Sequence, residues 1–272
     1  MTPVNLDVAP LRESWVRSLR AAGKAPRTVT SYCEALDSFT AWCEADGRPV
    51  LPDRQQRRDV EDFIAWLIDT RSTGTAGVRY RGLRQWWRWL EREGEADDAM
   101  NGMVHPKVEE TPPPIIKDEH LRALLDVTRG GRGERGLGDM QKLNARRDHA
   151  ILRVLIDTGM RRGEMGAPTL DDVDLDAGVL VVRRSKTGRG RVVPLGTKAV
   201  EAVDRYLRLR ARHRLAARRE LWLGLHGPLT GEGVRQLILA RCTEARIPPV
   251  HPHQFRHTAA HRWPIAGGQE QD

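Results

Sequence analysis

Cysteine is scarce in this sequence of 272 residues, and its placement excludes two kinds of cross-linked fold. The three cysteines, Cys33, Cys43 and Cys242, are scattered and form no Cys-x-x-Cys pair. Disulfide frameworks and zinc ribbons need closely spaced cysteines, so neither is expected. Isolated cysteines suit a reducing compartment, and we expect a cytoplasmic protein.

Long apolar runs and cofactor motifs are missing as well. No run of about 18 apolar residues occurs, so neither a transmembrane helix nor a membrane partner is expected. Residues 1–19 contain no apolar segment of the kind found in signal peptides. The sequence has no P-loop and no dinucleotide fingerprint, and we expect no cofactor.

Positive charge is abundant by contrast. The chain carries 45 Lys and Arg against 37 Asp and Glu, which gives a formal net charge of +8. A basic balance favours a polyanionic partner, with nucleic acid ahead of an acidic membrane surface. Nearly all the basic residues are arginine, however, and coding bias can produce that composition, so charge alone is a weak indicator.

Apolar residues at helical spacing predict an all-helical bundle in residues 1–107. Four segments show the pattern: 11–19, 28–42, 60–67 and 83–90. Pro26-Arg27-Thr28 opens the second helix, with Thr28 as its predicted cap, and Glu93-Gly94 ends the fourth. Trp86 and Trp87 fall on the apolar stripe of the fourth helix, so we expect them in the core.

A proline-rich linker at residues 108–114, VEETPPP, separates this bundle from a second domain at residues 115–272. The second domain is predicted to be mostly helical with a small β-sheet, so the fold class is mainly α. Asp118 caps its first predicted helix, and Thr158-Gly159 closes another. The expected hairpin joins 179–182 to 192–195, and helices are expected at 200–225, 234–245 and 253–263.

Three short motifs in the second domain carry groups suited to phosphodiester chemistry. Arg161 and Glu164 are three apart in Thr-Gly-Met-Arg-Arg-Gly-Glu, so the carboxylate can orient the guanidinium. Lys186 lies at the tip of the hairpin, and His253 and Arg256 share a helical face. Arginines grip phosphate oxygens, lysine can protonate a leaving oxygen, and histidine can move the proton of a nucleophile. Such a site needs no metal.

Each motif alone has a simpler explanation: a capped helix end, an exposed turn or a solvated helix face. In this order and on this architecture, the three together resemble the tyrosine recombinase, or phage integrase, family. The resemblance covers nearly the whole chain and includes Thr28–Tyr32 and the aromatic stretch Leu83–Leu90. It implies a SAM-like core-binding bundle followed by a catalytic domain of the DNA breaking-rejoining type.

The resemblance also implies a reaction, in which a tyrosine attacks the scissile phosphate and forms a 3′-phosphotyrosyl intermediate. Arg161 and Arg256 would clamp the phosphate, Lys186 would be the general acid, and His253 would assist as acid or base. His257 would support the site by a hydrogen bond, and Glu164 would orient Arg161. Family members act on double-stranded DNA, typically as tetramers on paired sites.

The sequence departs from the family pattern in two places. Pro168 stands where the family has an apolar helical residue, so the helix after the first motif is expected to end early. The family's tyrosine would lie beyond Asp272, and the tyrosines present are Tyr32, Tyr80 and Tyr206. Tyr206 lies on an apolar stripe and is expected in the core. We therefore expect a catalytic domain that is incomplete at its C-terminal end and inactive as the 272-residue chain.

The fourth helix of the bundle supplies candidate DNA contacts. Arg81, Arg84 and Arg88 recur at helical spacing and are predicted to bind the DNA backbone. The simpler alternative is a solvated helix face.

Three other functions remain open. His253, His257 and His261 recur every four residues, with His251 beside them, which could indicate a metal-dependent nuclease. The sequence lacks an HExxH motif, and the nearest downstream carboxylate is Glu270. A non-catalytic DNA-binding protein, derived from a truncated or degenerate recombinase, would share every motif. A type IB topoisomerase would use the same arginine, lysine and histidine chemistry.

Overall fold

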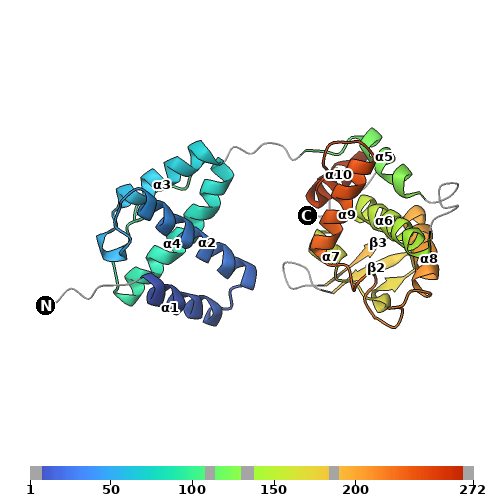
Figure 1. Cartoon of the computed structure of the whole chain (residues 1–272), viewed down its shortest axis with the longest axis horizontal. Coiled ribbons are helices and arrows are strands. Elements are labelled where there is room, and N and C mark those ends of the chain that lie inside the picture. Colours follow the sequence, from blue (N-terminus) through green and yellow to red (C-terminus); the bar gives the residue numbers. More distant parts are fainter. Residues whose placement is uncertain (1–7, 108–113, 130–137, 184–189, 266–272) are drawn as a thin grey trace. The chain divides into compact units, whose positions relative to one another are not determined.

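The chain divides into two compact units, Met1–Thr111 and Pro112–Asp272. The computed structural model describes residues 8–107, 114–129, 138–183 and 190–265 (Figure 1). The predicted linker at 108–114 lies outside these residues except for Pro114. None of the described helices is long and apolar enough to cross a membrane.

The first unit is helical throughout its described elements. These are α1 Val8–Ala21, α2 Pro26–Ala45, the 3-10 turn η1 Pro52–Arg54, α3 Arg57–Thr70 and α4 Thr73–Glu93. The apolar stripes thus predicted all four helices. Gly94 ends α4 in the left-handed conformation, with φ of 74°, as the sequence indicated.

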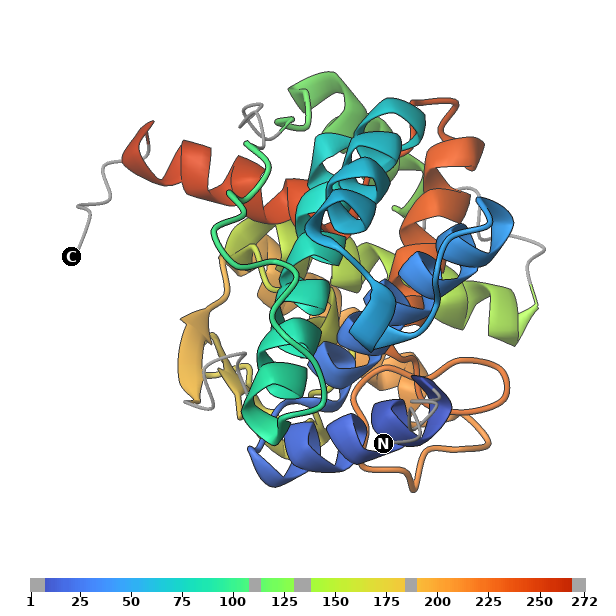
Figure 2. The ribbon, with the colours of Figure 1, turned by 90° about the vertical axis from the view of Figure 1, so that its left-hand side faces the viewer.

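Helices α2 and α4 pack directly on each other (Figures 1 and 2). A Cβ atom at Gly82 would lie only 2.5 Å from the Cβ of Ala35, so the absence of a side chain allows this close crossing. Trp86 and Trp87 of α4 are fully buried, which confirms their predicted place in the core. The ring of Trp86 meets Trp15 of α1 edge-on, with 5.1 Å between centroids.

The predicted cap of α2 is wrong. Helix α2 begins at Pro26, with Ala25 as its N-cap, and Thr28 lies inside the first turn. Proline is favoured at this first position because its fixed φ is helical and its missing N–H needs no partner. The start of the helix therefore needs no side-chain cap.

The second unit combines helices with a small sheet. Its described elements are α5 Asp118–Thr128, α6 Asp139–Thr158, α7 Arg162–Met165, η3 Leu170–Asp172, β1 Val173–Asp174, β2 Val179–Val182, β3 Arg191–Pro194, α8 Thr197–Arg210, α9 Gly231–Glu244 and α10 Pro252–Ile265. Helix α6 is central and packs against α5, α8 and α10. Asp118 is the first residue of α5 and Lys117 its N-cap, one residue before the predicted cap.

The described sheet is antiparallel, in the order β1-β2-β3. Strands β2 and β3 form the predicted hairpin, with Leu180 opposite Val193 and Val182 opposite Arg191. Leu180, Val182 and Val193 are buried in the core of this unit. The short strand β1 was not predicted, because two residues carry no alternating pattern.

The predicted helix at 200–225 is wrong in its second half. Helix α8 ends at Arg210, whose buried guanidinium donates to the carbonyls of Ala216, Arg218, Glu220 and Leu221. The chain then turns back, and the N–H of Leu221 donates to Pro168. These contacts satisfy carbonyl groups that a continued helix would have paired internally, so tertiary packing outweighs the helix propensity of the arginine-rich segment.

Candidate functional site

A glycine at the end of α6 places the first motif. Gly159 adopts the left-handed conformation, with φ of 56°, and its N–H donates to Leu155 at 3.0 Å, as the predicted helix end requires. The next helix, α7, begins three residues later at Arg162 and has Arg161 as its N-cap. Helix α7 ends at Met165, so the helix before Pro168 is short, as expected.

Glu164 binds Arg161 through both its backbone and its side chain. One carboxylate oxygen, Oε2, accepts the Arg161 N–H at 3.0 Å, and the other, Oε1, accepts from Nη1 of the same residue at 3.0 Å. The predicted pairing is therefore present, but it is a capping interaction because Arg161 precedes the helix. The Glu164 side chain is only 5% exposed, so this contact is largely removed from water.

Arg191, which sequence reasoning did not select, contacts the same carboxylate. Its Nη1 and Nη2 donate to Oε1 and Oε2 of Glu164 at 3.0 and 2.7 Å. Burial opposes ionisation of Glu164, but hydrogen bonds from Arg191 and Arg161 lower its pKa from 4.5 to about 2. The sequence signal for Arg191 was its place at the start of the second strand of the hairpin. Nothing near it in the sequence indicated that its partner, Glu164, lies 27 residues away.

Arg256, from the second motif, approaches this cluster on α10. A Cβ atom at Gly159 would lie 3.1 Å from the Cα of Arg256, so this glycine also lets α10 pack closely. Nη1 of Arg256 is 3.5 Å from the Gly159 carbonyl oxygen. Burial, and then the positive charge of Arg161, lower the pKa of Arg256. Arg161 and Arg191 thus bind the Glu164 carboxylate, and Arg256 lies near enough to interact electrostatically with both arginines and with Glu164. We call Arg161, Arg191 and Arg256 the arginine cluster, and it retains net positive charge.

Of the remaining predicted site residues, the structure describes His253 and His257. His253 is exposed and His257 half-buried on α10, and their rings stack with 6.2 Å between centroids. No described contact joins either histidine to Arg161. Lys186 lies outside the described residues. Their proposed roles therefore stay predictions.

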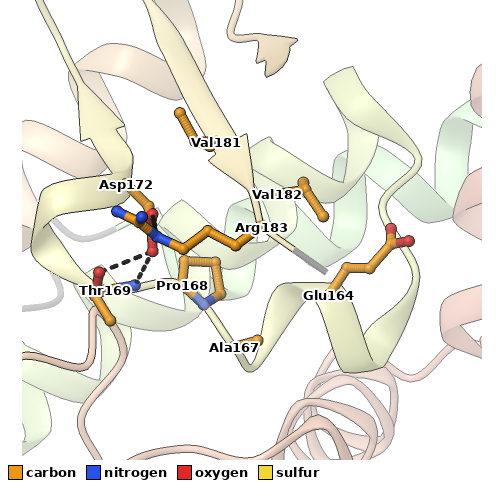
Figure 3. Close-up of a pocket in the computed structure, with 8 residues that line it drawn as sticks. All are labelled: Glu164, Ala167, Pro168, Thr169, Asp172, Val181, Val182 and Arg183. Atoms are coloured by element: carbon orange, nitrogen blue, oxygen red, sulfur yellow. Dashed lines mark hydrogen bonds and ion pairs between the residues drawn. The ribbon is translucent and has the colours of Figure 1, made fainter. Parts of the chain in front are cut away.

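A pocket of about 210 Å³ lies beside Glu164 (Figure 3). Asp172 lines it on the side away from the Glu164 carboxylate and forms an ion pair with Arg183. Both the N–H and the hydroxyl of Thr169 donate to Asp172 at 2.8 Å. The Thr169 bonds hold Asp172 in place, and the Arg183 ion pair connects the segment after α7 to the end of β2.

The predicted DNA-contacting arginines differ in exposure. Arg81 and Arg88 are exposed on α4. Arg84 is half-buried, donates to the Met100 carbonyl and pairs with Asp98 at 3.5 Å. Arg84 thus also holds the segment after α4 in place.

The spacing of the histidines does not assemble a metal site in the described part of the chain. Across residues 8–107, 114–129, 138–183 and 190–265, no group of three or more His, Cys, Asp or Glu side chains could hold a metal ion. Tyr206 is fully buried, as predicted. Its hydroxyl donates to the Leu221 carbonyl at 3.0 Å and accepts from the Leu223 N–H at 2.9 Å.

Both units match models of known protein families. Residues 120–267 match the phage integrase family, and residues 11–94 match the N-terminal SAM-like domain of phage integrases. The tyrosine recombinase XerD of Bifidobacterium longum is 30% identical over 249 residues, which are 88% of this chain and 78% of that protein. The tyrosine recombinase XerC of Chlorobaculum parvum is 30% identical over 286 residues, covering 95% of this chain and 84% of that protein.

Solved structures share the fold. A lambda integrase tetramer bound to a Holliday junction has a TM-score of 0.72 at 15% identity, covering 96% of this chain and 74% of that one. The Tn1549 transposon integrase in complex with a circular intermediate DNA has a TM-score of 0.70 at 16% identity, covering 95% and 88%. Since two family models and relatives at 30% identity agree over most of its length, the chain belongs to the phage integrase family of tyrosine recombinases.

Proposed function

We propose that this chain binds double-stranded DNA for site-specific recombination, with Arg161 and Arg256 gripping the scissile phosphate. The observation that carries the proposal is that Arg256 lies close to Arg161 while Glu164 neutralises only part of the positive charge of the arginine cluster. Guanidinium groups in a partly buried site stabilise the charge that builds on a phosphate in the transition state. Family membership supports the same conclusion.

The other roles follow from the family resemblance. Lys186 protonates the departing 5′ oxygen, His253 moves the proton of the nucleophile, and His257 supports the site by a hydrogen bond. Glu164 orients Arg161. The 3′-phosphotyrosyl intermediate keeps the energy of the broken bond, so rejoining needs no ATP.

The partners are double-stranded DNA and further copies of the chain. The lambda integrase relative was solved as a tetramer on a Holliday junction, and the Tn1549 relative was solved with DNA. We propose the same kind of assembly here, a tetramer on paired sites. Arg81, Arg84 and Arg88 contact the DNA backbone.

None of the tyrosines present is proposed as the nucleophile. Burial raises the pKa of Tyr206, and its hydroxyl is occupied by two backbone groups. Tyr32 and Tyr80 belong to the first unit, and the Tyr80 hydroxyl donates to the Met103 carbonyl at 2.6 Å. We therefore propose that the 272-residue chain binds DNA without cleaving it, because none of its three tyrosines stands where the family pattern requires the attacking oxygen.

A covalent-trapping assay tests the proposal. A duplex selected from a random pool for tight binding is nicked near each candidate scissile position and incubated with the 272-residue chain. We expect a shifted band on a native gel and no covalent adduct on a denaturing gel. Arg161→Ala and Arg256→Ala should weaken binding, whereas Arg205→Ala, on the exposed face of α8, should not. A covalent band would overturn the proposed inactivity. DNA binding that neither site variant weakens would overturn the proposed function.

A longer chain that includes the family's tyrosine separates a recombinase from a non-catalytic DNA-binding protein. The recombinase should form the covalent adduct, and the non-catalytic protein should not.

A further inference from the structure

Within the arginine cluster, Arg191 is the member that comes from the β-sheet. It opens β3, directly opposite Val182 of β2, and reaches a carboxylate on the separate helix α7. The Arg191 side chain is 33% exposed, and the carboxylate that it binds is nearly buried. Through this pair, the hairpin is joined to the segment that carries Arg161.

The hydrogen bonds to Glu164 saturate its carboxylate. Oε1 accepts from Nη1 of Arg161 and from Nη1 of Arg191, while Oε2 accepts from the Arg161 N–H and from Nη2 of Arg191. A carboxylate offers about four acceptor positions, so all are used. Loss of Arg191 would leave two of them empty in a nearly buried site and would free the carboxylate to rotate.

The two arginines use Glu164 differently. Arg191 binds the carboxylate in a two-pronged manner, through both terminal nitrogens. In the described part of the chain, the Arg161 guanidinium gives Glu164 only Nη1. Arg161 therefore keeps donors for an incoming phosphate, whereas the terminal donors of Arg191 are directed at the carboxylate.

We propose that Arg191 is a positioning residue that locks the Glu164 carboxylate and thereby holds the Arg161 guanidinium in its phosphate-binding orientation. This inference rests on the proposed function of the site as a DNA phosphate site. Its physical basis is geometry: a guanidinium matches both oxygens of a carboxylate, whereas an ammonium is a point charge that cannot fix the plane of the carboxylate.

A double-mutant cycle with Arg161 tests whether Arg191 acts through that residue. Arg191→Lys keeps the charge but loses the two-pronged bond, and Arg205→Lys is the matched control on an exposed ion pair with Glu201. We expect R191K to weaken binding of the full chain to the selected duplex about tenfold. In an Arg161→Gln background, R191K should change binding less than about twofold. Unchanged binding by R191K, or an equal loss in both backgrounds, would overturn the inference.

Arg161 side-chain mobility provides a test that needs no DNA. The ¹⁵N relaxation of the Arg161 Nε–H group is measured by NMR in wild type, R191K and R205K, with thermal unfolding as a check of folding. We expect R191K to increase the mobility of this group and R205K to leave it unchanged. If R191K does not fold, Arg191→Gln is tested in the same way. Unchanged mobility of Arg161 in R191K refutes the positioning role. Failure of the wild-type chain to bind duplex DNA refutes the proposed function instead. The mobility measurement then still decides whether Arg191 positions Arg161.

Discussion

At the scale of single residues, Glu164 makes the stability of the protein depend on pH. Because its folded-state pKa is about 2, below the ordinary 4.5, its ionised form stabilises the fold above about pH 4.5. That contribution, roughly 3 kcal/mol, is lost as the pH falls toward the folded-state pKa. We predict that Glu164→Gln lowers the free energy of unfolding at pH 6 and flattens its decline between pH 4.5 and 2.

Urea unfolding followed by circular dichroism at pH 6 and pH 3 measures this effect. The control is Glu201→Gln, which removes an exposed carboxylate paired with Arg205 on α8 and should keep the wild-type decline. A Glu164→Gln variant whose stability falls with acid as steeply as that of wild type would contradict the assignment of this decline to Glu164.

A second residue-scale prediction concerns Trp86 and Trp87. Both side chains are fully buried, so Trp86→Ala or Trp87→Ala should cost about 3–5 kcal/mol of unfolding free energy. In the described part of the chain, the Nε1 atom of Trp86 has no hydrogen-bond partner. Trp86→Phe should therefore cost much less than Trp86→Ala, since it removes an unpaired buried donor and keeps an aromatic ring. Urea unfolding ranks the variants, and an equally stable Ala variant that loses only DNA binding would argue for a base-stacking role.

At the scale of secondary-structure elements, the junction of α6, α7 and α10 depends on Gly159. A side chain there would adopt a strained positive φ and would press on the backbone of Arg256 and on Ala259, each 3.1 Å from the added Cβ. We predict that Gly159→Ala destabilises the protein by about 1–3 kcal/mol and weakens DNA binding, because α10 is displaced together with Arg256.

Gly163 provides the matched control for this substitution. It lies in α7, and a Cβ atom added there would meet nothing within 4 Å. Gly163→Ala should therefore be neutral or slightly stabilising, by about 0.5 kcal/mol. Thermal unfolding and duplex binding of the two variants are compared, and equal behaviour of both would show that close packing at Gly159 is unimportant.

At the scale of the whole molecule, a net charge of +8 and the proposed backbone contacts imply salt-dependent DNA binding. We predict that Arg81→Ala and Arg88→Ala each reduce the slope of log affinity against log salt by about 0.9, without loss of stability. Arg84→Ala should also lower stability, because Arg84 binds Met100 and Asp98. Arg58→Ala, whose side chain is 86% exposed on α3, is the control. Affinity that does not change with salt would exclude these contacts.

Sequence patterns located the helices of the first unit because each of them carries its own apolar stripe. The four helices of the first unit and the β2–β3 hairpin follow directly from local periodicity. The end of α8 at Arg210 does not, since the carbonyl groups that bind the Arg210 guanidinium become available only when the chain folds back. Local propensity could not reveal that competition.

The sequence by itself determined the family, through the order of its short motifs along the chain. It also determined the pairing of Arg161 with Glu164 and the burial of Trp86, because these depend on residues a few positions apart. Only the tertiary structure decided which groups complete the site. Arg191 meets Glu164 across 27 residues, and Arg256 meets Gly159 across 97. Such contacts depend on how helices and strands pack, and a guanidinium can find a carboxylate only after the core has brought their backbones together.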